Sequence, residues 1–120
     1  MKTRQKQVSA TKSSTKALEE GPLESMFPCS ASKILDFLCV FKKYDYSISD
    51  IAKNSGITFK TALHEVRKLE KQQVIVNSRT VGNAKMYQLN PDSVQAQSIN
   101  KLAMDLAFKR LQKSILDSST

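Results

Sequence analysis

The sequence predicts a mainly α-helical domain that carries one small β-hairpin. Apolar residues recur at helical spacing in four segments, and two short β-type runs, residues 74–76 and 86–89, flank a loop around Gly82 and Asn83. The chain has 120 residues, 40% of them hydrophobic, with few Gly and Pro. These values fit one small globular domain with room for tails.

Residues 1–27 are expected to form a flexible basic tail. This segment is rich in Lys, Gln, Ser and Thr, and it holds few large apolar side chains whose burial could offset the entropy cost of ordering. Two interpretations of its basic residues stay open, namely a solvated tail or an arm that follows phosphates. Those residues are Lys2, Arg4, Lys6, Lys12 and Lys16.

The ordered domain is expected to span residues 28–90. Its first helix should be capped by Ser30 or Ser32 and end near Lys43, because apolar residues recur there at helical spacing. These inward residues are Ile34, Leu35, Phe37, Leu38 and Phe41. A turn and a short extended piece should follow at residues 44–48.

A short second helix is expected at residues 50–54, with Ser49 as its cap. Gly56 suits the left-handed turn that would end it. Thr58 can then cap a third helix, residues 58–72. Its inward stripe has spacings of four and three and consists of Ala62, Val66 and Leu69.

The third helix leads into a hairpin. Residues 74–76 form the first β-run, residues 78–85 the loop, and residues 86–89 the returning strand. The segment 91–117 is expected to be helical again, from about residue 93 to residue 116. It has two apolar faces about 140° apart, Ile99, Leu102 and Leu106 on one and Met104, Phe108, Leu111 and Ile115 on the other. The first face should pack on the domain and the second should form a dimer with another copy of the chain.

The charge pattern favours an anionic partner. The formal net charge is +8, and residues 57–90 carry six basic and two acidic residues, which is half of the excess. Cys29 and Cys39 do not make a metal-ligand pair, and we expect both to be reduced. Because there is neither an apolar run long enough for a membrane span nor a signal peptide, we expect a soluble, cytoplasmic protein.

The order helix, extended piece, short helix, turn, helix and hairpin is that of a helix-turn-helix with a β-wing. GITFKTALHEVRKLEKQQVIVNSRTVGNAKMYQLN, residues 56–90, resembles the recognition helix and wing of the winged helix-turn-helix DNA-binding domains of ArsR- and MarR-type transcriptional regulators. ILDFLCVF resembles their first helix and ISDIAKNSGIT their second helix and turn. The resemblance covers about residues 30–90. The sequence lacks the Cys or His/Asp ligand set of ArsR-type metal sensors, so we expect no metal and no cofactor.

The resemblance and the helical geometry imply the same DNA-binding residues. The third helix would enter the major groove, and the wing would lie on the backbone or in the minor groove. Lys60 and Arg67 can reach guanine edges or phosphates, while Thr61 and Leu63 can meet thymine methyl groups. The full set is Thr58, Phe59, Lys60, Thr61, Leu63, His64 and Arg67 on the helix and Arg79, Asn83 and Lys85 on the wing. Two alternatives stay open: Phe59 and Leu63 could instead seal the core edge, and His64 could be a solvated helix residue.

The function expected from these features is sequence-specific binding of double-stranded DNA by a small homodimeric, nucleoid-associated transcriptional regulator. An enzyme is not expected, because the sequence has no Gly-rich phosphate loop, no HExxH and no nucleophile–His–acid set. No small-molecule effector is evident. Two alternatives are a winged-helix module for protein–protein interaction and a DNA-binding factor in plasmid or viral replication or partition.

Overall fold

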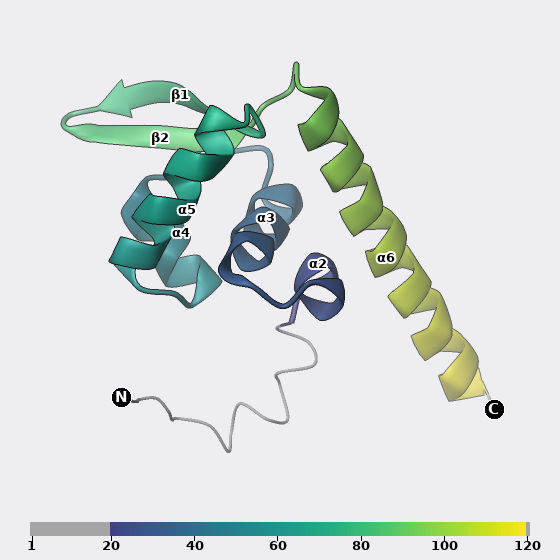
Figure 1. The fold of residues 1–120 in the computed structure, drawn as a ribbon. Helices are drawn as coiled ribbons and strands as arrows, with labels where there is room; N and C mark the ends of the chain where they lie inside the picture. The colour runs from purple at the N-terminus through teal and green to yellow at the C-terminus, as the bar shows by residue number, and fades with distance from the viewer. Residues whose placement is uncertain (1–19, 120) are drawn as a thin grey trace.

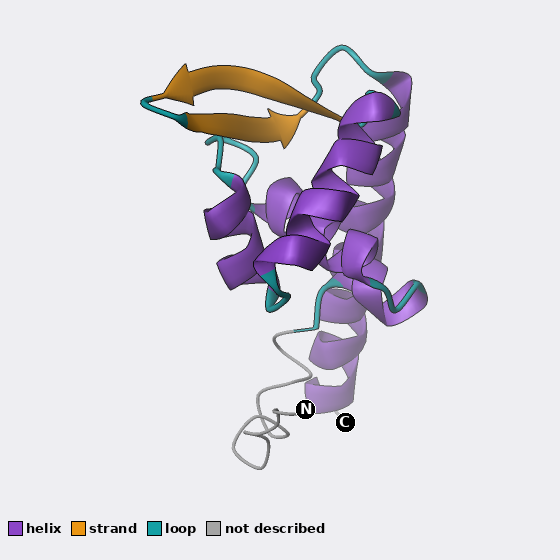
Figure 2. Ribbon diagram, turned by 60° about the vertical axis from the view of Figure 1, so that its left-hand side comes forward, coloured by secondary structure: helices purple, strands orange, loops and turns teal. Residues whose placement is uncertain are grey.

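The computed structural model describes residues 20–119, which form a mainly helical domain with one hairpin, as predicted. Helices α3, α4 and α5 lie together beneath the hairpin, and α6 runs along one side and extends past the rest of the domain (Figure 1). Figure 2 shows the same arrangement from a second direction. The elements in order are α2 (Pro22–Met26), α3 (Ser30–Val40), α4 (Ile48–Ser55), α5 (Phe59–Lys71), β1 (Ile75–Val81), β2 (Ala84–Leu89) and α6 (Val94–Ser119).

The hydrophobic core lies where the helices meet the base of the hairpin. The most deeply buried large side chains come from four elements and are each at most 1% exposed: Ile34, Leu38, Ile51, Val66 and Ile75. The predicted inward stripe of the third helix is confirmed, since Ala62, Val66 and Leu69 are all buried. Burial of this stripe fixes which face of α5 points outward.

Two of the predicted helix caps were wrong by a few residues. Helix α3 follows Cys29, and the Ser32 hydroxyl group instead donates a hydrogen bond to the carbonyl oxygen of Phe27. Helix α4 is capped by Ser47, whose Oγ accepts the Asp50 amide at 3.1 Å, and not by Ser49. Helix α4 ends at Gly56, which has φ +71°, as the left-handed turn requires.

The hairpin is longer than predicted. Strands β1 and β2 pair antiparallel from Ile75 opposite Leu89 to Val81 opposite Ala84, so most of the expected loop 78–85 is strand. The turn is formed by Gly82, with φ +62°, and Asn83. A β-bulge interrupts the ladder between Asn77 and Arg79. Beyond the hairpin itself, Tyr46 pairs with Tyr87 through two backbone hydrogen bonds of 2.8 and 2.9 Å.

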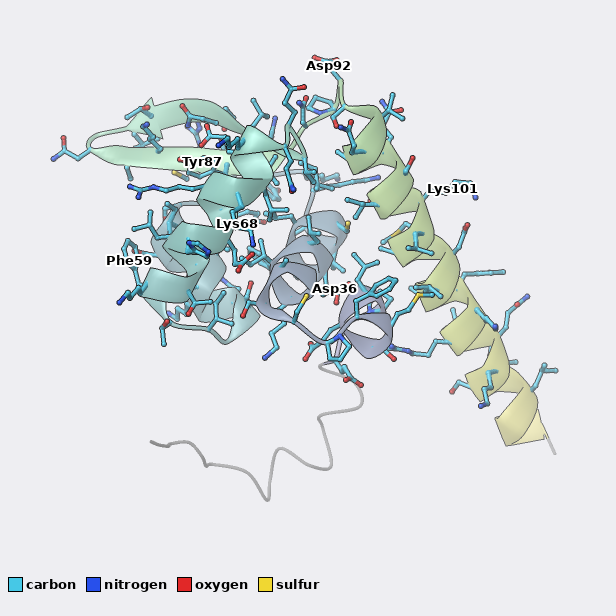
Figure 3. The ribbon with its side chains drawn as sticks, viewed as in Figure 1. Asp36, Phe59, Lys68, Tyr87, Asp92 and Lys101 are labelled. Atoms are coloured by element: carbon cyan, nitrogen blue, oxygen red, sulfur yellow. The ribbon has the colours of Figure 1, made fainter. Side chains whose placement is uncertain are left out.

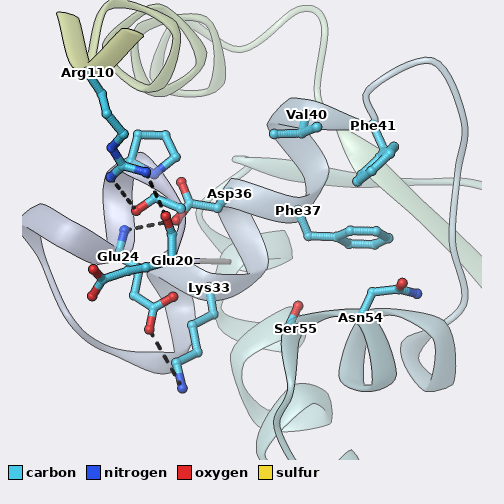
Figure 4. Close-up of a pocket in the computed structure, with 12 residues that line it drawn as sticks. Glu20, Glu24, Lys33, Asp36, Phe37, Val40, Phe41, Asn54, Ser55 and Arg110 are labelled. Atoms are coloured by element: carbon cyan, nitrogen blue, oxygen red, sulfur yellow. Dashed lines mark hydrogen bonds and ion pairs between the residues drawn. The ribbon is translucent and has the colours of Figure 1, made fainter. Parts of the chain in front are cut away.

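Helix α2 lies inside the segment predicted to be a flexible tail, so the predicted start of order near residue 28 was wrong. Both oxygens of the Asp36 carboxylate accept hydrogen bonds from backbone amides in the first turn of α2, from Leu23 at 2.8 Å and from Glu24 at 2.9 Å. Arg110 of α6 donates to the carbonyl oxygen of Glu20 at 2.8 Å (Figure 4). Leu23 is buried in the same core. The basic residues predicted for the tail start lie in residues 1–19, outside the described residues.

Gly21 stands at the tightest point of this attachment. A methyl group at this position would collide with the Asp36 carboxylate, so the close approach of the two segments requires glycine. Burial raises the pKa of Asp36 above its usual value although two amides donate to it. Helix α2 therefore joins α3 to α6 through polar contacts at its amino end and apolar contacts through Leu23.

Helix α6 packs on the domain through two of the three predicted residues, Ile99 and Leu106, but not through Leu102. Ala96, Ile99, Ala103 and Leu106 face the core, whereas Leu102, predicted to face it, is 37% exposed. Ser93 caps the helix by accepting the Ala96 amide at 3.2 Å. Among the helices of residues 20–119, none combines the length and the hydropathy needed to cross a membrane.

Candidate nucleic-acid interface

Helix α5 is capped at its start as predicted. Thr58 Oγ1 accepts the Thr61 amide at 3.2 Å and donates to Thr61 Oγ1 at 2.9 Å. The two hydroxyl groups therefore hold the first turn, and Thr61 is half-buried. The first amides of a helix have no acceptor within the helix, and such amides can bind an anion.

The outward face of α5 is basic. Lys60, His64 and Arg67 are all exposed, as the burial of the inward stripe requires. Phe59 is also exposed, at 52%, so it does not seal the core edge. Figure 3 shows Phe59 and Lys68 on α5, with Lys101 on the opposite side of the molecule.

A groove of about 400 Å³ separates α5 from the hairpin. Residues 47–49, at the start of α4, also line the groove. The groove brings together five residues predicted to contact DNA, Phe59, Leu63, Arg67, Asn83 and Lys85. Leu63 is half-buried there, which means that it both lines the groove and covers the core edge. Lys85 and Arg67 thus provide one positive charge on each wall.

Of the groove residues that the sequence analysis did not predict, two bear ionisable side chains, Glu70 and Tyr87. Glu70, one turn after Arg67 along α5, is half-buried, and Tyr87 of β2 forms part of the floor. Burial raises the pKa of Tyr87 above its usual value. The i+3 spacing from Arg67 to Glu70 could have placed Glu70 on this side, whereas the position of Tyr87 depends on the register of the hairpin.

The basic surface also extends further along α5 than predicted. Lys68 and Lys71 are exposed in the last turn, four residues after His64 and Arg67. Lys68, whose side chain is exposed, lies 3.8 Å from the half-buried Glu65, and a helical pair of this spacing contributes little to stability. The helical spacing was a sufficient signal for both lysines, because residues four apart share one face.

Arg79 does not lie in the groove. Its guanidinium group binds the Asp45 carboxylate, from Nε at 2.8 Å and from Nη2 at 3.1 Å. The hydrogen bonds from Arg79 and from the Ser78 hydroxyl group lower the pKa of Asp45 to about 2. Arg79 therefore differs from the other predicted wing residues, because its charge is already matched within the protein.

Within residues 20–119, His, Cys, Asp and Glu side chains do not gather in threes in a way that could hold a metal ion. The thiol of Cys39 is buried in the core, and burial raises its pKa to about 11. What the face does combine is a capped helix start, a row of basic side chains and a basic hairpin across a groove.

Solved structures similar to this chain include a transcription regulator and a repressor. MepR of Staphylococcus aureus, described as a transcription regulator of the multidrug efflux pump MepA, matches with a TM-score of 0.57 at 19% identity, over 90% of this chain and 78% of its own. A MepR mutant bound to an oligodeoxyribonucleotide matches with a TM-score of 0.58 at 16% identity, over 89% of this chain and 77% of its own. The multiple antibiotic-resistance repressor MarR of Listeria monocytogenes matches with 0.52 at 15% identity, over 90% and 73%.

The fold is therefore that of the winged helix-turn-helix class, as in MepR and MarR. This confirms the predicted fold and the resemblance to MarR-type proteins. Identities below 20% establish the fold alone. Neither the protein-family models nor the curated protein sequences yield a match to this chain.

Proposed function

We propose that this protein is a homodimeric transcriptional regulator that binds double-stranded DNA in a sequence-specific manner. Helix α5 would enter the major groove, and the hairpin would lie on the flanking backbone or in the minor groove. The observation that carries this proposal is the groove between Arg67 and Lys85, because two basic walls on a winged-helix frame suit a phosphate backbone. The oligodeoxyribonucleotide in the MepR structure supports the same assignment by analogy.

The outward residues of α5 have separable roles in this proposal. Lys60, His64 and Arg67 would contact base edges and phosphates, with Phe59 and Leu63 against thymine methyl groups. Lys85 and Asn83 would contact the backbone and fix the register without reading sequence. Thr58 and Thr61 would present the helix start to a phosphate. Affinity should therefore fall steeply with salt, while specificity depends on the α5 residues.

The homodimer would form through the exposed apolar side of α6. Met104, Phe108, Leu111 and Ile115 are between 37% and 60% exposed, and Phe108, Leu111 and Ile115 line a shallow apolar groove on this helix. An exposed apolar row of this length on a protruding helix is typical of a protein interface. A two-fold axis there would direct both α5 helices to half-sites about 34 Å apart, or a multiple of that, in an inverted repeat.

Selection of random duplex DNA by the purified protein at moderate salt, followed by sequencing, tests the proposal. Recovery of an inverted repeat is the expected result. A double variant, Lys60→Glu with Arg67→Glu, should lose this binding, whereas Lys101→Glu on the far side of the molecule should keep it. If the α5 variant retains its biological activity while no DNA is selected, α5 is a protein-docking surface instead.

Sedimentation of the full chain tests the dimer separately. Phe108→Asp combined with Leu111→Asp should give a monomer, because two desolvated charges cannot face each other in an apolar interface. Val94→Asp is the matched control, since Val94 is an exposed apolar residue of the same helix outside the row. Dimers of the double variant would exclude this side of α6 as the interface.

The proposed cellular role follows from the proposed chemistry. A DNA-binding regulator would act in the cytoplasm, on the nucleoid, and would need no catalytic group. A DNA-binding factor in plasmid or viral replication or partition would use the same surface. Genome-wide mapping of bound sites distinguishes these roles, because a regulator occupies promoters and a replication or partition factor occupies origins or centromere-like repeats.

A further inference from the structure

The hairpin is attached to the body of the domain by the side chain of Asp45. Asp45 lies in the segment between α3 and α4, and its carboxylate accepts hydrogen bonds from Ser78 Oγ and from Nε and Nη2 of Arg79. The Asp45 side chain is only 12% exposed although it belongs to a connecting segment. One carboxylate from outside the hairpin thus holds two consecutive residues of β1.

The β-bulge makes this double contact possible. In a regular strand, consecutive side chains point to opposite faces, so Ser78 and Arg79 could not both reach one carboxylate. The bulge between Asn77 and Arg79 interrupts that alternation. Asn77 Nδ2 stabilises the bulge by donating to the carbonyl oxygens of Arg79 at 2.9 Å and Met86 at 2.8 Å. The bulge and the carboxylate therefore form one structural device.

The segment that carries Asp45 is itself fixed on both sides. Tyr46 pairs with Tyr87 of β2 through the backbone, and its ring lies 4.6 Å from the ring of Phe37 on α3, measured between centroids. Movement of Asp45 relative to α3 would break these contacts. The carboxylate thus transmits the position of the helical body to β1.

We propose that Asp45 is a positioning residue for DNA binding, and that Arg79 acts through Asp45 instead of contacting DNA. The inference rests on the proposed function. Asp45 sets the distance between the hairpin and α5, which places Lys85 across the groove from Arg67. The proposal reverses the expectation from simple electrostatics, because removal of an acidic residue near a DNA-binding face should otherwise strengthen binding.

The test compares DNA affinities of Asp45→Asn, Arg79→Lys and the double variant at 0.1 M salt. Loss of one phosphate contact weakens binding about eightfold under these conditions, so Asp45→Asn should weaken it roughly 8- to 60-fold for one or two contacts in a dimer. Arg79→Lys keeps the positive charge but loses the bidentate hydrogen bonding to Asp45, and it should weaken DNA binding to a similar degree. The double variant should be no weaker than either single variant, because both changes remove the same interaction.

The matched control is Asp50→Asn, which removes one exposed negative charge from α4 and should not weaken binding. Amide hydrogen exchange of the DNA-free protein gives an independent readout: residues 76–88 should exchange faster in Asp45→Asn, while α6 is unchanged. Equal or tighter DNA binding by Asp45→Asn, or unchanged hairpin exchange, would overturn the inference while leaving DNA binding intact. If the wild-type protein binds no DNA, the proposed function fails, and this inference fails with it.

Discussion

Substitution of Lys85 by Ala gives a quantitative test of the wing contact and of the dimer together. Lys85 is exposed on β2 at the groove, so its removal should cost a phosphate contact without disturbing the core. Each lost contact lowers the slope of log affinity against log salt by about 0.9. A symmetric dimer loses two contacts, which gives a change of about 1.8, whereas a monomer gives about 0.9.

The slope change converts into an observable ratio. Between 50 and 200 mM salt, a fourfold range, the ratio of the DNA affinity of the wild type to that of Lys85→Ala should fall about 12-fold for a dimer and about 3.5-fold for a monomer. Fluorescence anisotropy with a labelled duplex at five or six salt concentrations measures both slopes.

Lys101→Ala is the matched control, since it also removes one exposed lysine but lies on α6, where it pairs with Asp105 at 2.7 Å. An unchanged slope for Lys85→Ala would refute the wing contact. An equal change for both variants would show that only net charge matters.

Three further results are expected. Ile34→Ala, at a fully buried site, should lower the free energy of unfolding by about 2–5 kcal/mol in urea titrations, and an effect below 1 kcal/mol would contradict the assigned core. Gly21→Ala should lower the free energy of unfolding by about 1–3 kcal/mol because the added methyl group meets the Asp36 carboxylate. Ser25→Ala in α2 serves as the control. Wild-type stability of Gly21→Ala would show that α2 can shift away from Asp36 at little cost. Asp45 has a pKa of about 2 in the folded protein, below its pKa of about 4 in an unfolded chain. Its contribution to the free energy of unfolding is therefore complete at pH values above the unfolded-state pKa, and it is lost as the pH falls through the folded-state pKa. The difference in unfolding free energy between wild type and Asp45→Asn should therefore be constant above about pH 5 and shrink toward pH 2, and a constant difference over that whole range would show that the carboxylate has no such role.

The sequence was sufficient wherever the decisive signals were local. The cap at Thr58, the left-handed turn at Gly56 and the stripe of Ala62, Val66 and Leu69 all lie within one or two helical turns of the structure that they determine. For this reason the order of elements and the outward face of α5 could be predicted. The small errors at the caps of α3 and α4 have the same origin, because several serines compete there and the choice depends on tertiary packing.

Features formed by distant residues could not be predicted in this way. Arg79 looked like a wing contact because its partner, Asp45, is 34 residues away in the sequence. Helix α2 is too short to be stable alone, and it depends on Asp36 and on Arg110, which is 90 residues from Glu20. Pro22 and Glu24 in its first turn are local signals for a helix start, within a segment of otherwise polar composition.

Helix α2 also has a mechanical consequence. Helix α6 has 26 residues and is therefore about 39 Å long, so it acts as a lever arm on the winged body. A rotation of about 5° at one end would move the other end by about 3.4 Å, which is the rise of one base pair. In the proposed dimer, the contact of Arg110 with the Glu20 carbonyl oxygen would hold the part of α6 that carries the apolar row, and so would limit rotations of this kind.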